Sequence, residues 1–248
     1  MQFFKDITFC VKTVHRPWSC NRLVISWLEH FERPNIIVVD DGLDGRRFSQ
    51  LHPVTAQHCR VIDLPEHDVG VGVGRNTAID AAETELIFLL DDDHIVDARL
   101  QLDQVYQRFH KHSIDILGVR QGNGGRPLML SPLMAGKRIW MHRGEFRAVG
   151  PVSWCDMSSN AFLARHDTIA ELRWDPELKT YEHWEFFYRA SRVSGLQVAV
   201  ATDCHIRHAH VETNDYGHLR FRAKYRKLGL KKHGFHSMRY PGGAIVHA

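Results

Sequence analysis

The stretch Leu86-Ile87-Phe88-Leu89-Leu90-Asp91-Asp92-Asp93-His94 decides the fold class. Its first five residues are all apolar, which is typical of a parallel strand that is covered on both faces. Two more runs have the same character, Ile7 to Val11 and Asn35 to Val39. Residues with helical spacing separate the runs: Trp18, Ile25, Leu28 and Phe31, then Ala78, Ala81 and Ala82. The sequence therefore predicts an α/β domain with a mostly parallel central sheet flanked by helices.

The polar end of this stretch is the first candidate site. Ligands of open α/β sheets bind beyond the carboxyl ends of the strands, where Asp91-Asp92-Asp93-His94 lies. Three adjacent carboxylates repel one another and need a positive partner, and oxygen ligands with an imidazole nearby suit Mg²⁺ or Mn²⁺. Asp91 and Asp93 alternate along the chain, so they point the same way. The alternative is a solvated acidic turn that caps the next helix.

The second strand ends in a similar way, at Asp40-Asp41-Gly42. A carboxylate at this place could accept hydrogen bonds from a nucleobase or a ribose hydroxyl. The same three residues also favour a simple Asx turn, because Asp and Gly suit tight turns. The sequence leaves both interpretations open.

A glycine-rich stretch, Gly70 to Asn76, lacks the G-x-G-x-x-G spacing of a dinucleotide fingerprint. We therefore interpret it as a flexible glycine loop that opens a helix, with Arg75 at the helix start, where a guanidinium and backbone donors could meet phosphate oxygens. The alternative is a hinge loop with a surface arginine. A further helix from Leu100 to His112 and a strand from Ile114 to Val119 precede a second Gly-rich loop at residues 121–125.

The predicted helix from Tyr181 to Ser194 places Glu182 and Glu185 three residues apart on one face, with His183 between them. If this face meets the acidic strand end, one of the three could be a general base. On an ordinary helix they would form a charged exterior. A predicted strand from Gln197 to Thr202 leads to three histidines: His205, His208 and His210. One of them could be a metal ligand, although in a chain with 18 histidines the default role of any single one is structural.

Composition narrows the class of protein. The 248 residues are 44% hydrophobic and 25% charged, which is typical of a globular protein. A net charge of +3 gives no indication of nucleic-acid binding. The five cysteines form no C-x-x-C pair, and no apolar run reaches the length of a membrane span or signal peptide, so we expect a cytoplasmic, non-secreted chain.

Residues 216–248 contain many Lys and Arg residues and no Asp or Glu. This basic tail, with Phe221 and Tyr225 among its charges, could contact anionic lipid at the cytoplasmic face of a membrane or hold an acidic acceptor. A solvated cationic helix or a disordered end is the alternative.

Taken together, these motifs resemble those of a GT-A glycosyltransferase of the family 2 type over most of residues 6–210. In the first half, the resemblance rests on four motifs in family order: Val11-Lys12-Thr13 with Arg16, Val38 to Asp41, Gly74 to Ala78 and Leu90 to Asp93. The second half is similar to β-1,4-N-acetylgalactosaminyltransferases through three segments: Asp156 to Arg165, Trp174 to Leu178 and Glu182 to Phe187.

The resemblance implies a GT-A domain over residues 1–215, with a nucleotide-sugar half to about residue 120, an acceptor half after it, and the basic tail. It implies a metal-dependent, inverting transfer from a UDP-sugar, with N-acetylgalactosamine or a galactose-like sugar favoured, to a glycan or glycolipid acceptor. Mn²⁺ or Mg²⁺ would be bound by Asp91 and Asp93 as the D-x-D motif, and by His208.

The resemblance also assigns residues to the substrates. The nucleotide-sugar side would include Thr13, Arg16, Asp40, Asp41, Arg75, Asn76, Asp91 and Asp92, and the acceptor side Asp156, Asn160 and Trp184. Many inverting relatives have an aspartate base at the place of His183, so Glu182, His183 and Glu185 all stay candidates for the base. Two other classes stay open: a sugar-1-phosphate nucleotidyltransferase, and a non-catalytic module that binds a sugar nucleotide.

Overall fold

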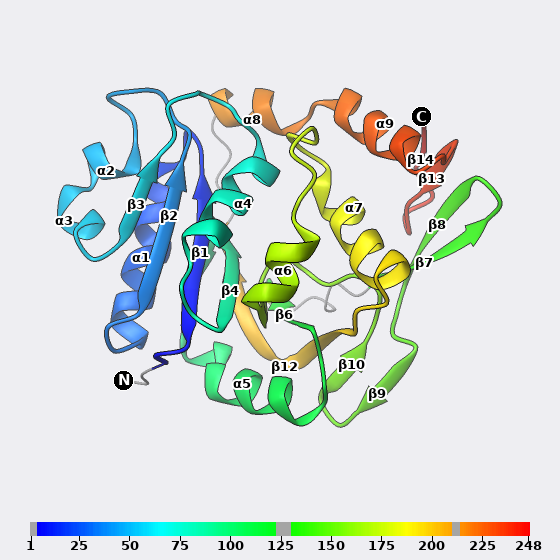
Figure 1. Cartoon of the computed structure of the whole chain (residues 1–248), viewed down its shortest axis with the longest axis horizontal. Helices are drawn as coiled ribbons and strands as arrows, with labels where there is room; N and C mark the ends of the chain where they lie inside the picture. Colours follow the sequence, from blue (N-terminus) through cyan, green and yellow to red (C-terminus); the bar gives the residue numbers. More distant parts are fainter. Residues whose placement is uncertain (1–3, 123–129, 210–213) are drawn as a thin grey trace.

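The computed structural model describes residues 4–122, 130–209 and 214–248. In these residues a ten-stranded sheet forms the centre of the molecule, in the order β3-β2-β1-β4-β11-β6-β12-β10-β9 with β5 beside β12 (Figure 1). The strands are β1 (Ile7–Thr13), β2 (Asn35–Asp40), β3 (Arg60–Asp63), β4 (Leu86–Asp91), β5 (His94–Ile95), β6 (Ile116–Gln121), β9 (Arg147–Val149), β10 (Val152–Trp154), β11 (Phe162–Arg165) and β12 (Val198–His208).

Strands β3, β2, β1 and β4 are parallel, and β11 runs antiparallel between β4 and β6. The predicted α/β class with a mostly parallel sheet is therefore confirmed. The register places Thr13 beside Asp40 and Lys12 beside Asp91, so the polar ends of three strands meet at one edge.

Helices cover both faces of the sheet (Figure 1). Alternate residues of β1 and β4 enter two separate cores, with Phe9 and Phe88 in one and Cys10 and Leu89 in the other. Helices α1 and α5 pack in the first core, and α4, α6, α7 and α9 in the second. The helices are α1 (Pro17–His30), α2 (Phe48–Leu51), α3 (Pro53–Ala56), α4 (Val71–Ala81), α5 (Leu102–Lys111), α6 (His166–Leu172), α7 (Glu182–Tyr188), α8 (Asn214–Arg220) and α9 (Ala223–Lys232).

The C-terminal residues form helices and strands that belong to the same fold. In a second sheet of order β14-β13-β8-β7, strand β13 pairs with β8 from the middle of the chain. Leu230, Phe235, Met238 and Val246 lie in the second core. The strands of this sheet are β7 (Leu130–Ala135), β8 (Arg138–Arg143), β13 (Ser237–Arg239) and β14 (Ile245–His247).

Some predicted local details are wrong. Helix α1 forms as expected, but Trp18 is 67% exposed, and the buried face carries Leu23, Val24 and Trp27 instead. The stretch that we expected to be a flexible glycine loop is the first turn of α4, so Arg75 lies one turn inside this helix. The helix expected to reach Ser194 gives way to a π-helical turn at Arg189–Val193. His210 and most of the predicted loop at 121–125 lie outside the described residues.

Across the described ranges, no helix combines the length and the apolar character that crossing a membrane requires.

Candidate active site

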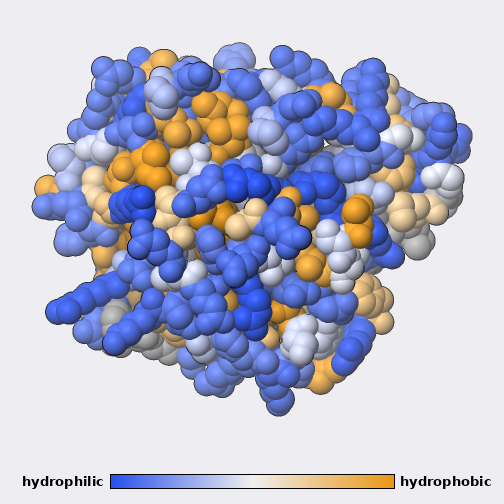
Figure 2. Space-filling model, viewed as in Figure 1, coloured by the Kyte–Doolittle hydropathy of each residue, from blue (hydrophilic) through white to orange (hydrophobic). Residues whose placement is uncertain are grey.

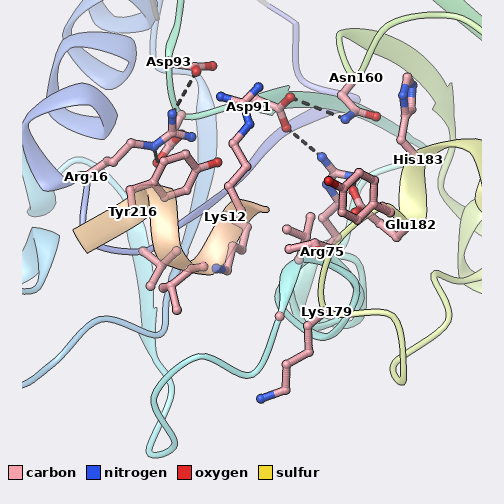
Figure 3. A pocket seen from close by; sticks show the side chains of 18 of the residues that line it. Lys12, Arg16, Arg75, Asp91, Asp93, Asn160, Lys179, Glu182, His183 and Tyr216 are labelled. Atoms are coloured by element: carbon pink, nitrogen blue, oxygen red, sulfur yellow. Dashed lines mark hydrogen bonds and ion pairs between the residues drawn. The ribbon is translucent and has the colours of Figure 1, made fainter. Parts of the chain in front are cut away.

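A cavity of about 430 Å³ opens at the carboxyl ends of β1 and β4 (Figure 3). Its wall is completed by the start of α4, by the residues around the start of α7, and by α8. Five carboxylates and six basic side chains line it, so the cavity suits a ligand that bears several charges: Asp68, Asp91, Asp92, Asp93 and Glu182, with Lys12, Arg16, Arg75, Lys179, Arg220 and Arg222.

Arg16 neutralises the middle of the acidic run. Its guanidinium donates to both oxygens of Asp92, and its Nη1 lies 2.8 Å from Asp93 Oδ2. Thr13 Oγ1 donates to Asp92 Oδ2 at 2.7 Å. The ring of Tyr216 covers the guanidinium, 3.8 Å from its carbon. Burial nevertheless raises the pKa of Asp92 to about 6.

Asp91 faces the cavity and is held from two sides (Figure 3). Arg75 Nη2 donates to its Oδ1 at 2.7 Å, and Asn160 Nδ2 lies 3.4 Å from its Oδ2. Burial alone would raise the pKa of Asp91, but the charge of Arg75 brings it below its usual range. Arg75 also donates to Glu182 Oε1 at 2.9 Å, so one buried cation joins the carboxylates of β4 and α7. Burial raises the pKa of Glu182 against the opposing charge of Arg75.

Asp93 and His208 meet at the other end of the acidic run, with His208 Nε2 3.2 Å from Asp93 Oδ2. Burial opposes ionisation of Asp93, but the hydrogen bond with His208 and the charge of Arg16 hold its pKa well below the usual range. The hydrogen bond raises the pKa of His208 in turn.

The chemistry of Asp91, Asp93 and His208 fits Mn²⁺ or Mg²⁺, since carboxylate oxygens and an imidazole are ligands these ions accept. All three side chains line the cavity. Within the described residues, however, no three such side chains already converge on a common point that could hold a metal ion. The two carboxylates form ion pairs with arginines instead, Asp93 with Arg16 and Asp91 with Arg75.

His183 lines the cavity as a neutral imidazole. Its Nε2 lies 2.7 Å from the carbonyl oxygen of Ser158, which can only accept, so Nε2 carries the proton and Nδ1 the lone pair. Burial lowers the pKa of His183 to about 4, and the charge of Arg75 contributes to this. The side chain therefore has an acceptor nitrogen available at neutral pH.

Four of the predicted nucleotide contacts hold backbone or neighbouring side chains instead of facing the cavity. Asp40 accepts the backbone N–H groups of Gly42 and Phe48, each at 2.7 Å, so the Asx-turn alternative describes it. Asp41 pairs with Lys12 at 2.8 Å. Asn76 exchanges two hydrogen bonds with the backbone of Trp174, at 2.8 and 2.9 Å. Thr13 is also buried, and its hydroxyl group donates a hydrogen bond to Asp92.

Glu185, a candidate base, lies outside the cavity in this structure. It leaves the cavity and pairs with Arg189 at 2.7 Å and His233 at 2.9 Å beside a second, shallower pocket. These two partners bring the pKa of Glu185 below its usual range although burial raises it. Two predicted acceptor-side residues also lie elsewhere: Trp184 is buried against His233, and Asp156 pairs with Arg192. Asn160 does line the cavity.

Several cavity residues escaped the sequence analysis. Lys179 and Tyr181 precede α7, and the loop residue Asp68 binds Arg222 from the C-terminal region at 2.5 and 3.0 Å. Tyr181 has a left-handed backbone with φ of 61°. Lys12, which the sequence analysis assigned to no substrate, could have been found from its position at the end of a predicted strand. The contact of Asp68 with Arg222 joins distant parts of the chain, and no local pattern predicts it.

Comparison with known proteins identifies relatives of this chain. A model of the family described as Glycosyl transferase family 2 matches residues 17–168. The β-1,4 N-acetylgalactosaminyltransferase 2 of Mus musculus is 25% identical over 186 residues, which cover 73% of this chain and 35% of that protein. The β-1,4 N-acetylgalactosaminyltransferase 1 of Homo sapiens is 25% identical over 215 residues, which cover 82% of this chain and 39% of that protein. The chain thus spans less than two fifths of these curated relatives.

Solved structures share the fold. S. aureus TarS 1-349 in complex with UDP-GlcNAc has a TM-score of 0.65 at 18% identity, over 92% of this chain and 65% of that one. GalNAc-T7 with UDP, GalNAc and Mn²⁺ has a TM-score of 0.67 at 14% identity, over 83% of this chain and 43% of that one. The predicted resemblance to GT-A glycosyltransferases is confirmed.

Proposed function

Because the chain belongs to glycosyl transferase family 2, we propose that it transfers a sugar from a UDP-sugar to a hydroxyl group of a glycan or glycolipid acceptor. The observation that supports this proposal most directly is the charged cavity of about 430 Å³ at the carboxyl ends of β1 and β4. Its size and its ring of cations suit a nucleoside diphosphate with a sugar. The names of the curated relatives favour N-acetylgalactosamine as the sugar.

The donor diphosphate would lie among the cavity cations. Lys12, Arg75 and Lys179 come from β1, α4 and the segment before α7, so they surround the cavity instead of forming a single row. Such fixed charges stabilise the negative charge that develops on the leaving diphosphate. Asp91, Asp93 and His208 would hold a divalent cation, which supplies Lewis-acid neutralisation of the diphosphate when bound.

Among the three candidate bases, His183 has the support of the geometry. Glu182 is engaged by Arg75, and Glu185 leaves the cavity. His183 Nδ1 would accept the proton of the acceptor hydroxyl while the oxygen of that hydroxyl forms its bond to the anomeric carbon. The bond from the anomeric carbon to the diphosphate oxygen breaks with its electrons, and UDP leaves. Attack opposite to the leaving group would invert the anomeric centre.

Thermal melts of the purified chain test the donor. We expect UDP with Mn²⁺ to raise the melting temperature, because a ligand that binds only the native state stabilises it. We expect CDP, GDP or ATP to have smaller effects, and EDTA to abolish the UDP shift. Asp93→Asn should weaken the Mn²⁺-dependent part. Shifts that are equal for all nucleotides would contradict the UDP assignment, and a transfer rate of Asp93→Asn within a few-fold of wild type at saturating Mn²⁺ would remove the metal assignment.

His183→Gln tests the base. We expect kcat to fall about 10²- to 10⁴-fold, since general base catalysis contributes this much, while the affinity for UDP stays unchanged. Glu185→Gln is the matched control, and its kcat should stay within a few-fold of wild type. The assay is sugar transfer from UDP-N-acetylgalactosamine, with the melting temperature of each variant measured beside it. A large loss in Glu185→Gln with little loss in His183→Gln would reverse the assignment.

A further inference from the structure

Exposed residues along α9 and just before it form a basic surface that we define by Phe221, Lys224, Lys227 and Lys231. Phe221 also lines the cavity. Phe221 is 64% exposed, and the three lysines are exposed. Spacings of three and four residues place the lysines on one face of α9. Among the described residues, no carboxylate lies within ion-pair distance of these lysines, although Lys232 next to them pairs with Asp175. This C-terminal basic surface therefore presents unneutralised positive charge.

The inner side of the same segment is attached to the cavity. The ring of Tyr216 lies on Arg16, and Arg222 binds Asp68 with two hydrogen bonds. Leu230 is fully buried, and a Cβ added at Gly229 would meet Trp184 at 2.9 Å. The inner contacts thus fix the C-terminal basic surface in position relative to the cavity.

We propose that the C-terminal basic surface docks on an anionic lipid bilayer. Lysines are hydrated point charges on flexible stems, which suits a diffuse layer of anionic headgroups. An exposed aromatic ring beside them adds apolar contact with the interfacial region of a bilayer. A purely polar partner offers no such contact. The same edge of the molecule is mostly hydrophilic, with isolated apolar patches (Figure 2).

Docking would also orient the cavity entrance relative to the membrane. Arg220, Phe221 and Arg222 belong to the cavity wall as well as to the segment that carries the basic surface. The entrance would therefore lie beside the headgroups. The docking itself needs no sugar transfer, so it can be tested without a donor or an acceptor.

Vesicle flotation tests the proposal on the full chain. We expect binding to phosphatidylcholine vesicles that contain phosphatidylserine, weak binding to phosphatidylcholine alone, and a decrease with added salt. Lys227→Gln with Lys231→Gln should lower the partition coefficient about 25-fold, or about five-fold for each lysine. The matched control is Arg33→Gln with Lys111→Gln, which removes two exposed charges. These residues lie between α1 and β2 and at the end of α5, at the opposite edge from α8 and α9 (Figure 1).

The control double variant should float like wild type. Equal losses in both double variants would show a net-charge effect and overturn the proposal. So would equal binding to the two kinds of vesicle. Retention on heparin with no flotation on phosphatidylserine vesicles would assign the surface to a soluble polyanion instead. Melting temperatures with UDP, measured on the same samples, separate a failure of docking from a failure of the donor site.

Discussion

Arg16 pairs with the adjacent carboxylates Asp92 and Asp93, Arg75 joins Asp91 of β4 to Glu182 of α7, and both arginines are buried. A buried guanidinium that loses its partners is costly, and so is a buried carboxylate without a cation. The two arginines therefore keep the acidic strand end neutralised while no substrate is bound. If a divalent cation or a diphosphate binds there as proposed, these ion pairs would have to rearrange.

The neutral state of His183 gives a pH dependence of folding. Burial lowers its pKa from 6.5 to about 4, so between these values the unfolded chain binds a proton that the native chain does not. The free energy of unfolding from this group is then fully present above pH 6.5 and falls as the pH drops toward 4. The loss is at most about 3 kcal/mol, less any screening by solvent.

Urea denaturation at a series of pH values measures this term. We expect His183→Gln to flatten the dependence between pH 6.5 and 4 relative to wild type. The exposed His110 serves as control, and His110→Gln should keep the wild-type slope. A His183→Gln curve parallel to wild type would show that His183 titrates normally in the folded chain.

At single positions the sequence predicts chemistry better than it predicts partners. Repulsion among three adjacent aspartates correctly indicated a positive partner, but Arg16 supplies it in this structure, through the ion pairs to Asp92 and Asp93. Asp40 and Asn76 have the residue types of ligand contacts and are used to hold the backbone. Polar groups at a buried strand end serve both purposes, and only the surrounding fold decides between them.

At the scale of elements, α4 shows why the glycine stretch was misinterpreted. Glycine is a poor helix former, so three glycines between residues 70 and 76 look like a loop. Glycine stands here because α4 approaches β1 closely: a Cβ added at Gly74 would collide with the side chain of Lys12. Close packing therefore overrides the intrinsic preference. The three apolar strands were predictable, by contrast, because each is buried on both faces over most of its length.

Gly74→Ala tests this close approach. The added methyl group must displace Lys12, which pairs with Asp41, so we expect the free energy of unfolding to fall by about 1–3 kcal/mol. Gly217→Ala in α8 is the control, because no atom lies within 4 Å of its added Cβ. Alanine favours helix there, so this variant should be unchanged or up to about 1 kcal/mol more stable. Equal behaviour of the two variants in urea denaturation would exclude a packing role for Gly74.

At the scale of the whole molecule, the C-terminal residues join the second core instead of standing apart. Leu230 and Met238 are fully buried there, among residues of α4 and α7. The pairing of β13 with β8 connects segments that are far apart in sequence. A single sequence carries no signal for such a pairing, which is why composition alone suggested a tail at residue 216. The division of the chain into halves stays a prediction.

Leu230→Ala measures how strongly this region supports the rest. Removing a fully buried leucine side chain should cost about 2–5 kcal/mol. If the molecule unfolds as one unit, hydrogen exchange in β1 and β4 should accelerate along with exchange in α9. Lys227→Ala, an exposed neighbour on α9, should change stability by less than about 0.5 kcal/mol. Acceleration confined to α9 would show that the C-terminal helices open independently.

The closure of the cavity by Tyr216 and Arg222 has a consequence for biosynthesis. A ribosome makes the chain from its N-terminus, so every strand of the ten-stranded sheet is complete before these two residues are added. The acidic strand end and Arg16 are therefore synthesised before the Tyr216 ring that covers Arg16 in the complete chain. A product that terminates before Tyr216 would hold every strand of the sheet but lack the part of the cavity wall that Tyr216 and Arg222 supply.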